Sequence, residues 1–274
     1  MKLIHRIGLS ASDSQLCQLA SLGVKYETVM EQRSGTMIVF LVDEEDASWP
    51  SVSSLITEWK APDLAYAEFS RHELANSQYV RMGPEWHHGY PQPEDGYEHT
   101  TYDSSGYCSQ CKMGLKQQAP FRMCREPKWG RRQILQLNWV MGEFFVTPEA
   151  WESVFKPFGI DCLPVMQHKG GRPLKTALQL EITAWTSSVD MPDGYVAERC
   201  GACMRESLAL RSPGRFPHVD LPENVHIART PEYFGGGVPW HEVIISASLY
   251  TAIMSHNLRG ATFEVVAAPG QPRR

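Results

Sequence analysis

Two cysteine pairs far apart in the chain constrain its fold more than any other sequence feature. Each pair has the spacing Cys-x-x-Cys, the first formed by Cys108 and Cys111 and the second by Cys200 and Cys203. A tight turn can direct both sulfurs of a pair at one metal ion, and two such turns supply a closed tetrahedral shell of four thiolates. A closed shell leaves no coordination position for a substrate. The motif therefore predicts one structural Zn²⁺ bound by all four cysteines.

The separation of the two pairs is unusual for a zinc module. Between Cys111 and Cys200 lie 88 residues, whereas simple modules have roughly 15–20. A metal here would join the beginning of a long segment to its end. Two other interpretations remain open, namely redox-active dithiols and ordinary buried cysteines. The remaining cysteines, Cys17, Cys124 and Cys162, are expected to be buried, unreactive thiols.

The length and composition indicate a folded protein of one large or two ordinary domains. The chain has 274 residues, of which 42% are hydrophobic and 21% charged. His5 and Arg6 interrupt the apolar segment that a secretory signal needs, and no window approaches the ~20 apolar residues of a membrane span. We therefore expect a cytoplasmic protein that does not contact a membrane. In a reducing compartment, paired cysteines favour metal ligation over disulfides.

The first 72 residues predict a small α/β unit. Apolar residues alternate over 2–9 and run through 24–30 and 36–42, as expected of strands. A helix that Ser12 or Asp13 begins and Gly23 ends separates the first two strands, and 49–59 has helical spacing. The order strand, helix, strand, strand, helix is most of a ferredoxin-like βαββα unit.

The rest of the chain divides into a connector and an α+β domain. Residues 73–104 contain closely spaced turn residues and aromatic rings, so we expect an ordered connector. Residues 105–274 contain both Cys-x-x-Cys pairs, each of which is expected to form a turn called a zinc knuckle. This segment predicts an α+β domain that is stapled by zinc. The expected elements are strands at 133–140, 144–146, 178–185, 242–246 and 260–266, a helix that Thr147 caps, and a helix from Ser246 to about His256.

Charge is distributed unevenly along the chain, which suggests two surfaces with different partners or a domain boundary. Residues 1–103 hold 7 Lys/Arg against 16 Asp/Glu, whereas residues 104–274 hold 19 against 15. An acidic surface accelerates association with a basic partner. The candidate partner-binding loop comprises Asp43, Glu44, Glu45, Asp46 and Trp49. A solvated loop without a partner is the alternative.

A basic stretch after the first knuckle favours a second hypothesis, nucleic-acid binding. Seven cations lie within residues 112–132, with Glu126 as the single acid. Cations interleaved with aromatic rings can follow a phosphate backbone and stack on bases. The candidate residues are Lys112, Lys116, Arg122, Arg125, Lys128, Trp129, Arg131 and Arg132.

The sequence contains no recognisable catalytic constellation. His87, His88, His99 and His241 are conceivable ligands of a catalytic metal, but they lack the His-Glu-x-x-His spacing. A Gly-x-Ser-x-Gly elbow and a phosphate-binding loop are also missing. Catalysis therefore ranks below the two binding hypotheses.

Residues 105–274 resemble two groups of bacterial proteins. The widely spaced knuckles resemble the double-CXXCG motif family, in which glycine follows the second cysteine of each pair; here Lys112 and Met204 take those positions. The ending, from Glu242 to Val266, looks like the closing strand, helix and strand of immunity proteins that neutralise polymorphic toxins. The resemblance implies a non-catalytic bacterial protein that binds a protein partner, namely a toxin.

Overall fold

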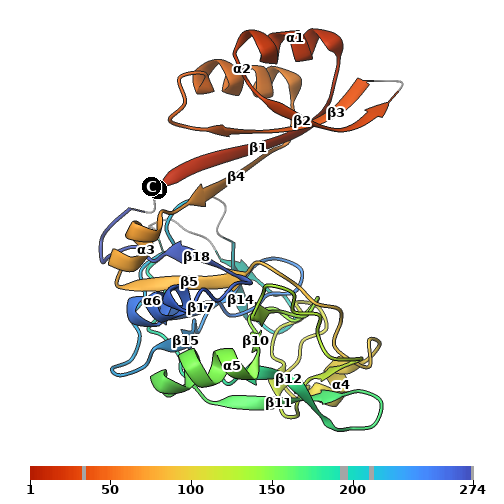
Figure 1. Cartoon of the computed structure of the whole chain (residues 1–274), viewed down its shortest axis with the longest axis vertical. Coiled ribbons are helices and arrows are strands. Elements are labelled where there is room, and N and C mark those ends of the chain that lie inside the picture. The colour runs from red at the N-terminus through yellow and green to blue at the C-terminus, as the bar shows by residue number, and fades with distance from the viewer. Residues whose placement is uncertain (33–34, 192–196, 210–212, 273–274) are drawn as a thin grey trace. The chain divides into compact units, whose positions relative to one another are not determined.

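The computed structural model describes residues 1–32, 35–191, 197–209 and 213–272. The chain is a mixed α and β protein, in which short strands outnumber helices. It folds into two compact units (Figure 1). The first consists chiefly of Met1–Ser70, and the second of Arg71–Leu210 and Phe216–Pro272.

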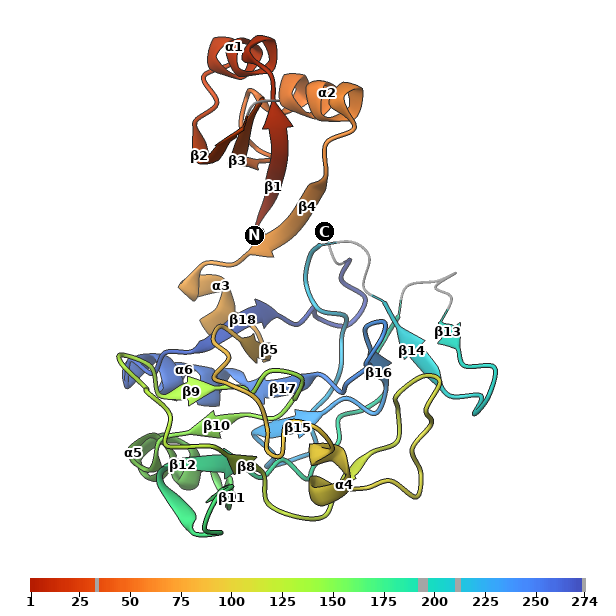
Figure 2. The same cartoon turned by 90° about the vertical axis from the view of Figure 1, so that its right-hand side faces the viewer.

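The first unit is a four-stranded antiparallel sheet covered by two helices. Neighbouring strands follow the order β2-β3-β1-β4, and every adjacent pair is antiparallel. Both helices lie on the same face of this sheet (Figures 1 and 2). The elements are β1 (Lys2–Ala11), α1 (Asp13–Ser21), β2 (Tyr26–Gln32), β3 (Gly35–Asp43), α2 (Trp49–Trp59) and β4 (Asp63–Glu68).

Local sequence signals account for most of this unit. The Ser12 hydroxyl accepts the Gln15 N–H while the Gln15 side chain accepts the Ser12 N–H, which is a reciprocal cap at the start of α1. Alternation places Ile7, Ile38 and Phe40 in the core between sheet and helices. The expected three strands and two helices are confirmed, and β4 is an additional strand that the sequence pattern did not indicate.

The described strands of the second unit form four small sheets. Their strand orders are β8-β11-β12-β10-β9, β15-β17-β5-β18, β13-β14-β16 and β6-β7. Its helices are α3 (Arg71–Asn76), α4 (Tyr97–Thr101), α5 (Pro148–Ala150) with a π turn (Trp151–Phe155) and a 3-10 turn (Lys156–Phe158), and α6 (Ala247–Ser255). Its strands are β5 (Tyr79–Pro84), β6 (Tyr102–Asp103), β7 (Lys116–Gln117), β8 (Arg122–Met123), β9 (Ile134–Leu135), β10 (Phe145–Val146), β11 (Cys162–Gln167), β12 (Pro173–Leu180), β13 (Glu198–Arg199), β14 (Glu206–Leu208), β15 (Ile227–Arg229), β16 (Tyr233–Phe234), β17 (Val243–Ser246) and β18 (Ala261–Val265).

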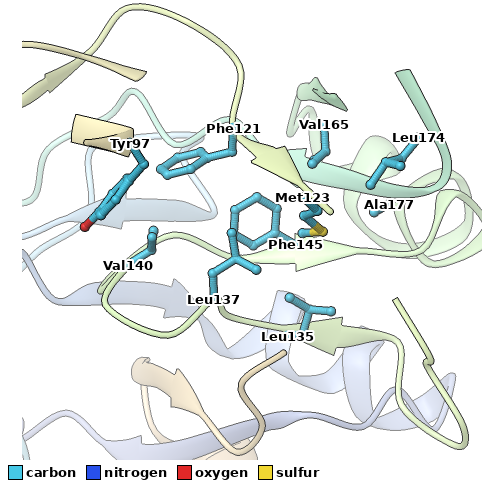
Figure 3. Close-up of a cluster of buried hydrophobic side chains, with 10 residues drawn as sticks. All are labelled: Tyr97, Phe121, Met123, Leu135, Leu137, Val140, Phe145, Val165, Leu174 and Ala177. Carbon is cyan, nitrogen blue, oxygen red and sulfur yellow. The ribbon is translucent and has the colours of Figure 1, made fainter. Parts of the chain in front are cut away.

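Aromatic side chains fill the core of the five-stranded sheet. Phe121 and Phe145 are fully buried, and their rings meet edge to face at 5.5 Å (Figure 3). Tyr97 from α4 and Leu135 from β9 belong to the same cluster, so segments far apart in sequence share one core. A second buried cluster contains Phe216 from the loop before β15, together with strand residues of the four-stranded and three-stranded sheets. Such clusters supply most of the free energy that stabilises irregular segments.

The expected connector, residues 73–104, is instead part of the second unit. Strand β5 pairs with both β17 and β18 and therefore lies in the interior of the four-stranded sheet. Val80 and Met82 of this strand are buried. The sequence interpretation was wrong because only residues after Pro84 are rich in turn signals, and the short apolar strand before them was included in the same segment.

Several expected elements of the second unit differ in length. The strand expected at 133–140 is reduced to Ile134–Leu135, and the one expected at 178–185 is Pro173–Leu180. The two helix starts are confirmed, because the Thr147 hydroxyl accepts the Ala150 N–H at 3.2 Å and the Ser246 hydroxyl accepts the Leu249 N–H at 3.2 Å. Caps act locally, whereas strand ends depend on neighbouring strands.

Gly260 is required where β18 begins. It has φ of +110°, and a Cβ atom there would collide with the Ile134 carbonyl oxygen. We expect Gly260→Ala to lower the free energy of unfolding by about 2 kcal/mol, measured by chemical denaturation. Gly170 is the matched control, because it has φ of +105° and a Cβ atom added there would meet no other atom within 4 Å. Equal losses at both positions would assign the effect to backbone conformation and not to the collision.

Candidate metal centre

The first knuckle is a tight turn closed by two backbone hydrogen bonds. The Lys112 N–H donates to the Cys108 carbonyl at 2.8 Å, and the Cys108 N–H donates to the Met113 carbonyl at 2.9 Å. Lys112 has φ of 62°, in the left-handed region. This conformation reverses the chain immediately after Cys111 and keeps both sulfurs on the same side of the turn.

The second knuckle repeats the same hydrogen-bond pattern. The Met204 N–H donates to the Cys200 carbonyl at 2.9 Å, and the Cys200 N–H donates to the Arg205 carbonyl at 2.9 Å. Met204 has φ of 64°. The antiparallel pair β13 and β14 flanks this turn, with Arg199 opposite Glu206. The two knuckles therefore have equivalent backbone geometry, and the second forms the tip of a β-hairpin.

The fold brings the four sulfurs together. The Sγ atoms of Cys108 and Cys200 are 3.8 Å apart, those of Cys111 and Cys203 are 3.5 Å apart, and all four lie within 4.8 Å of one another. A tetrahedron with metal–sulfur bonds of ~2.3 Å has edges of ~3.8 Å. A disulfide requires about 2.05 Å. The arrangement therefore matches a four-thiolate site that could hold one metal ion.

Backbone N–H groups favour the thiolate form of one cysteine in each knuckle. The pKa of Cys108 is lowered to about 6, first because the Cys111 N–H donates to its sulfur. The pKa of Cys200 is lowered by the equivalent Cys203 N–H. Burial raises the pKa of Cys111 to about 12. Four thiolates at this distance require a cation to balance their charge, and metal binding releases the remaining protons.

Arg205 connects the two knuckles through hydrogen bonds, a role that the sequence did not predict. Its Nη1 donates to the Gly106 carbonyl at 2.7 Å and to the Met113 carbonyl at 3.3 Å. These carbonyls belong to the segments that enter and leave the first knuckle, whereas Arg205 directly follows the second. Its position two residues after Cys203 is the only sequence signal that could have indicated this role.

The residue after the second cysteine of each knuckle has a left-handed backbone conformation, which lowers the stability of the protein when that residue is not glycine. Met204 is 56% exposed, so its side chain contributes little packing. A left-handed L-residue costs roughly 1–2 kcal/mol, partly offset by the greater unfolded-state entropy of glycine. We expect Met204→Gly to raise the free energy of unfolding by about 0.5 kcal/mol, measured by denaturant titration. Met204→Ala retains a Cβ and should give no gain; an equal gain would refute the conformational explanation.

Two of the remaining cysteines are not buried as expected. Cys17 and Cys124 are exposed, and Cys162 is partly buried. Cys17 lies on the outer side of the short helix α1, and Cys124 follows the two-residue strand β8, so neither faces a core. Burial raises the pKa of Cys162. The expectation was wrong for the first two because it rested on residue type alone.

Most of the candidate partner-binding loop has structural contacts. Asp43 binds the Lys2 ammonium at 3.0 Å and accepts the Glu45 N–H at 3.0 Å, while Asp46 accepts the Ser48 N–H at 2.8 Å. These backbone contacts lower the pKa of both aspartates. Carboxylates at these positions are therefore explained by turn formation.

His5 contacts two other residues of this candidate loop, Glu44 and Trp49. Its ring stacks on Trp49 with centroids 3.8 Å apart, its Nδ1 lies 2.8 Å from Asp63, and its Nε2 lies 3.4 Å from Glu44. His5 is 6% exposed. Trp49 thus covers a buried histidine and packs against the core of the first unit.

The basic stretch is mostly exposed but does not form a single loop. Glu126 accepts the N–H groups of Lys175 and Thr176, which attaches the middle of the stretch to β12. The Arg132 guanidinium lies 5.0 Å from the centre of the Trp86 ring, which meets Trp129 edge to face at 6.2 Å. Arg122 is partly buried in β8. The exposed cations are Lys112, Lys116, Arg125, Lys128, Arg131 and Arg132.

The four histidines considered as metal ligands do not gather into one site. Among the residues that the structure describes, the four cysteines form the only group of three or more metal-ligating side chains. His88 packs against Trp86, and burial lowers its pKa. His241 contacts the Glu232 carbonyl through Nδ1 at 3.1 Å, and burial lowers its pKa too. His87 forms an isolated bridge with Gln136, and His99 lies in α4.

Within the described ranges, no helix has both the length and the apolar character that crossing a membrane requires. The chain matches none of the protein-family models, curated proteins or solved structures with which it was compared.

Proposed function

We propose that the second unit is a zinc-stapled α+β domain in which Cys108, Cys111, Cys200 and Cys203 bind one structural Zn²⁺. The observation that carries the proposal is the convergence of four sulfurs within 4.8 Å. An all-sulfur tetrahedral donor set favours Zn²⁺ over the harder cations. The ion supplies positive charge to the thiolates and joins the two knuckles, and the closed shell makes its contribution structural.

Elemental analysis tests this proposal directly. The purified full chain should contain about one Zn²⁺ per molecule, and a thiol-reactive reagent should release it stoichiometrically. Iron in place of zinc would retain the site but change the metal. Protein that contains no metal after purification without chelator, and takes up none when Zn²⁺ is added, would reduce the knuckles to ordinary cysteines.

We also propose a ferredoxin-like topology for the first unit. Support comes from the order β1-α1-β2-β3-α2-β4 and from the antiparallel sheet β2-β3-β1-β4. Many unrelated functions use this arrangement, so it contributes no function by itself.

We infer that the protein acts by binding a protein partner, and that this partner is a toxin neutralised in the bacterial cytoplasm. What supports this is the resemblance of residues 105–274 to immunity proteins and the acidic balance of residues 1–103. Within the acidic loop, Glu45 is the side chain most available to a partner, because it is exposed while Asp43 and Glu44 contact Lys2 and His5.

An immunity gene is expected to lie beside its toxin gene, so co-expression with the product of the neighbouring gene tests the partner hypothesis. Protection of cells by the intact protein, and loss of protection with Glu45→Lys at unchanged protein level, would support it. Failure of the two purified proteins to associate would contradict it.

Nucleic-acid binding is the second candidate, favoured by the Trp86, Trp129 and Arg132 cluster beside exposed cations. A guanidinium on an indole face can present N–H groups to phosphate while the rings accept stacked bases. Salt-dependent binding to mixed RNA or single-stranded DNA, weakened by Arg131→Glu with Arg132→Glu, would support it. Elution from heparin at low salt, with no binding to either nucleic acid, would eliminate it.

A further inference from the structure

The second unit contains a cavity of about 740 Å³ beside the knuckles. This volume is typical of sites for small molecules. Gly106 and Gly114, on either side of the first knuckle, line one side, and residues that follow β12 line another. The knuckle geometry does not require such a cavity, and no sequence motif predicted it.

Hydrogen bonds join the polar side chains of its lining to one another and to the backbone. Arg229 donates through Nη2 to both oxygens of Glu143 at 2.9 Å and through Nη1 to the Gly142 carbonyl at 2.8 Å. Gln179 donates to Glu143 at 2.9 Å and exchanges hydrogen bonds with Gln117 at 2.7 and 2.8 Å. Groups fixed in this way are preorganised, so a ligand would meet a surface that needs little rearrangement.

Aromatic rings form another part of the lining. His241 meets Trp185 edge to face at 4.9 Å and lies 4.1 Å from the ring of Tyr233. All three residues line the cavity, and Trp185 is 49% exposed. An indole with half its surface in water beside a cavity is suited to stacking on a planar ligand. Burial lowers the pKa of His241, which favours its neutral form.

Cations outnumber acids among the lining residues. The lining contains three cations, Lys116, Arg205 and Arg229, and two acids, Glu143 and Glu181. Glu143 is already paired with Arg229. Arg205 donates to two backbone carbonyls and has no carboxylate within ion-pair distance among the described residues. A partly buried guanidinium that pairs with no carboxylate is suited to bind an anionic group of a ligand.

We propose that this cavity binds a small planar aromatic anion. Its ring stacks at Trp185 and Tyr233, and its anionic group lies toward Arg205 and Lys116. The shared chemistry includes nucleoside monophosphates and aromatic carboxylates. This proposal is independent of the protein partner and of which metal the knuckles hold.

Calorimetric titration of the 274-residue chain tests the proposal with two pairs of probes. Adenosine monophosphate is compared with neutral adenosine, and indole-3-acetate with neutral indole-3-acetamide. We expect one of the anions to bind with Kd below about 1 mM, and its neutral counterpart to bind at least about ten-fold more weakly. The pair that responds distinguishes the phosphate source from the carboxylate source. No binding of either anion at millimolar concentration overturns the proposal.

Matched variants locate the binding site. Trp185→Ala should weaken the anion about ten-fold or more, whereas Trp139→Ala, which removes a 54% exposed tryptophan outside the cavity, should not. Lys116→Glu should weaken the anion several-fold without affecting the neutral probe, and exposed Lys169→Glu should leave both unchanged. Both cavity positions are exposed, so these variants should fold. Equal effects at cavity and control positions would place binding elsewhere and overturn the proposal.

Discussion

Cys203→Ser is expected to lower the free energy of unfolding of the second unit by at least about 4 kcal/mol and to abolish stoichiometric metal binding. A metal bound by all four cysteines would cross-link two turns separated by 88 residues, and a covalent link closing a loop of ~100 residues is worth about 4.7 kcal/mol by chain entropy. A serine hydroxyl is a poor ligand for a thiolate-bound zinc. Removal of Zn²⁺ from the intact protein by a strong chelator should reproduce the effect.

Cys124→Ser is the matched control for this experiment. Cys124 is exposed and lies outside the cluster, so its replacement should change stability by no more than about 0.5 kcal/mol. Hydrogen exchange adds a spatial readout, because amides of β13 and β14 should lose protection while those of the first unit, which has its own core, keep it. Equal stability of both cysteine variants and the parent would contradict a structural metal.

Arg229→Met is expected to cost about 3–5 kcal/mol, because it leaves the Glu143 carboxylate buried without its counterion. The two side chains are only 13% and 12% exposed, and the guanidinium also holds the Gly142 and Ile182 carbonyls. The loss therefore includes backbone groups on two loops as well as the ion pair. Denaturant titration gives the free energy, and thermal unfolding should shift in the same direction.

A double-mutant cycle separates the ion pair from the rest of this network. Combining Arg229→Met with Glu143→Gln should cost less than the sum of the single variants, because no unpaired charge remains. Lys156→Met is the surface control: its pair with Glu152 is 2.6 Å long but more than half exposed on both sides, so its removal should cost under about 1 kcal/mol. Strict additivity in the cycle would mean that the pair is not energetically coupled.

Local features of this fold could be predicted wherever short-range chemistry decides the conformation. Ser12, Thr147 and Ser246 begin helices because a hydroxyl three residues before a free N–H is sufficient to cap it. The alternating strands of the first unit could also be predicted, because one face of each strand packs against the core that this unit's strands and helices share. In contrast, β9 covers only Ile134–Leu135 of the strand expected at 133–140, because its ends depend on tertiary packing, which no sequence period reports.

Function-related surfaces were harder to predict because they depend on which residues meet. The acidic loop suggested a partner, yet Lys2, His5 and backbone N–H groups from the same unit already bind the carboxylates of Asp43, Glu44 and Asp46. Arg205 and Arg229 carried no recognisable motif. Their roles arise from carbonyls and carboxylates 47 to 99 residues away in sequence.

By itself the sequence determined the two knuckles, since Cys-x-x-Cys is a local turn that presents two sulfurs whatever surrounds it. Only the tertiary structure decided that the turns face each other, with Cys108 beside Cys200 and Cys111 beside Cys203. The physical reason is that bringing residues 92 positions apart into contact costs chain entropy, which only the packing of a whole unit can offset. The same packing forms the cavity next to the knuckles, and therefore its aromatic and cationic lining could be identified only from the folded chain.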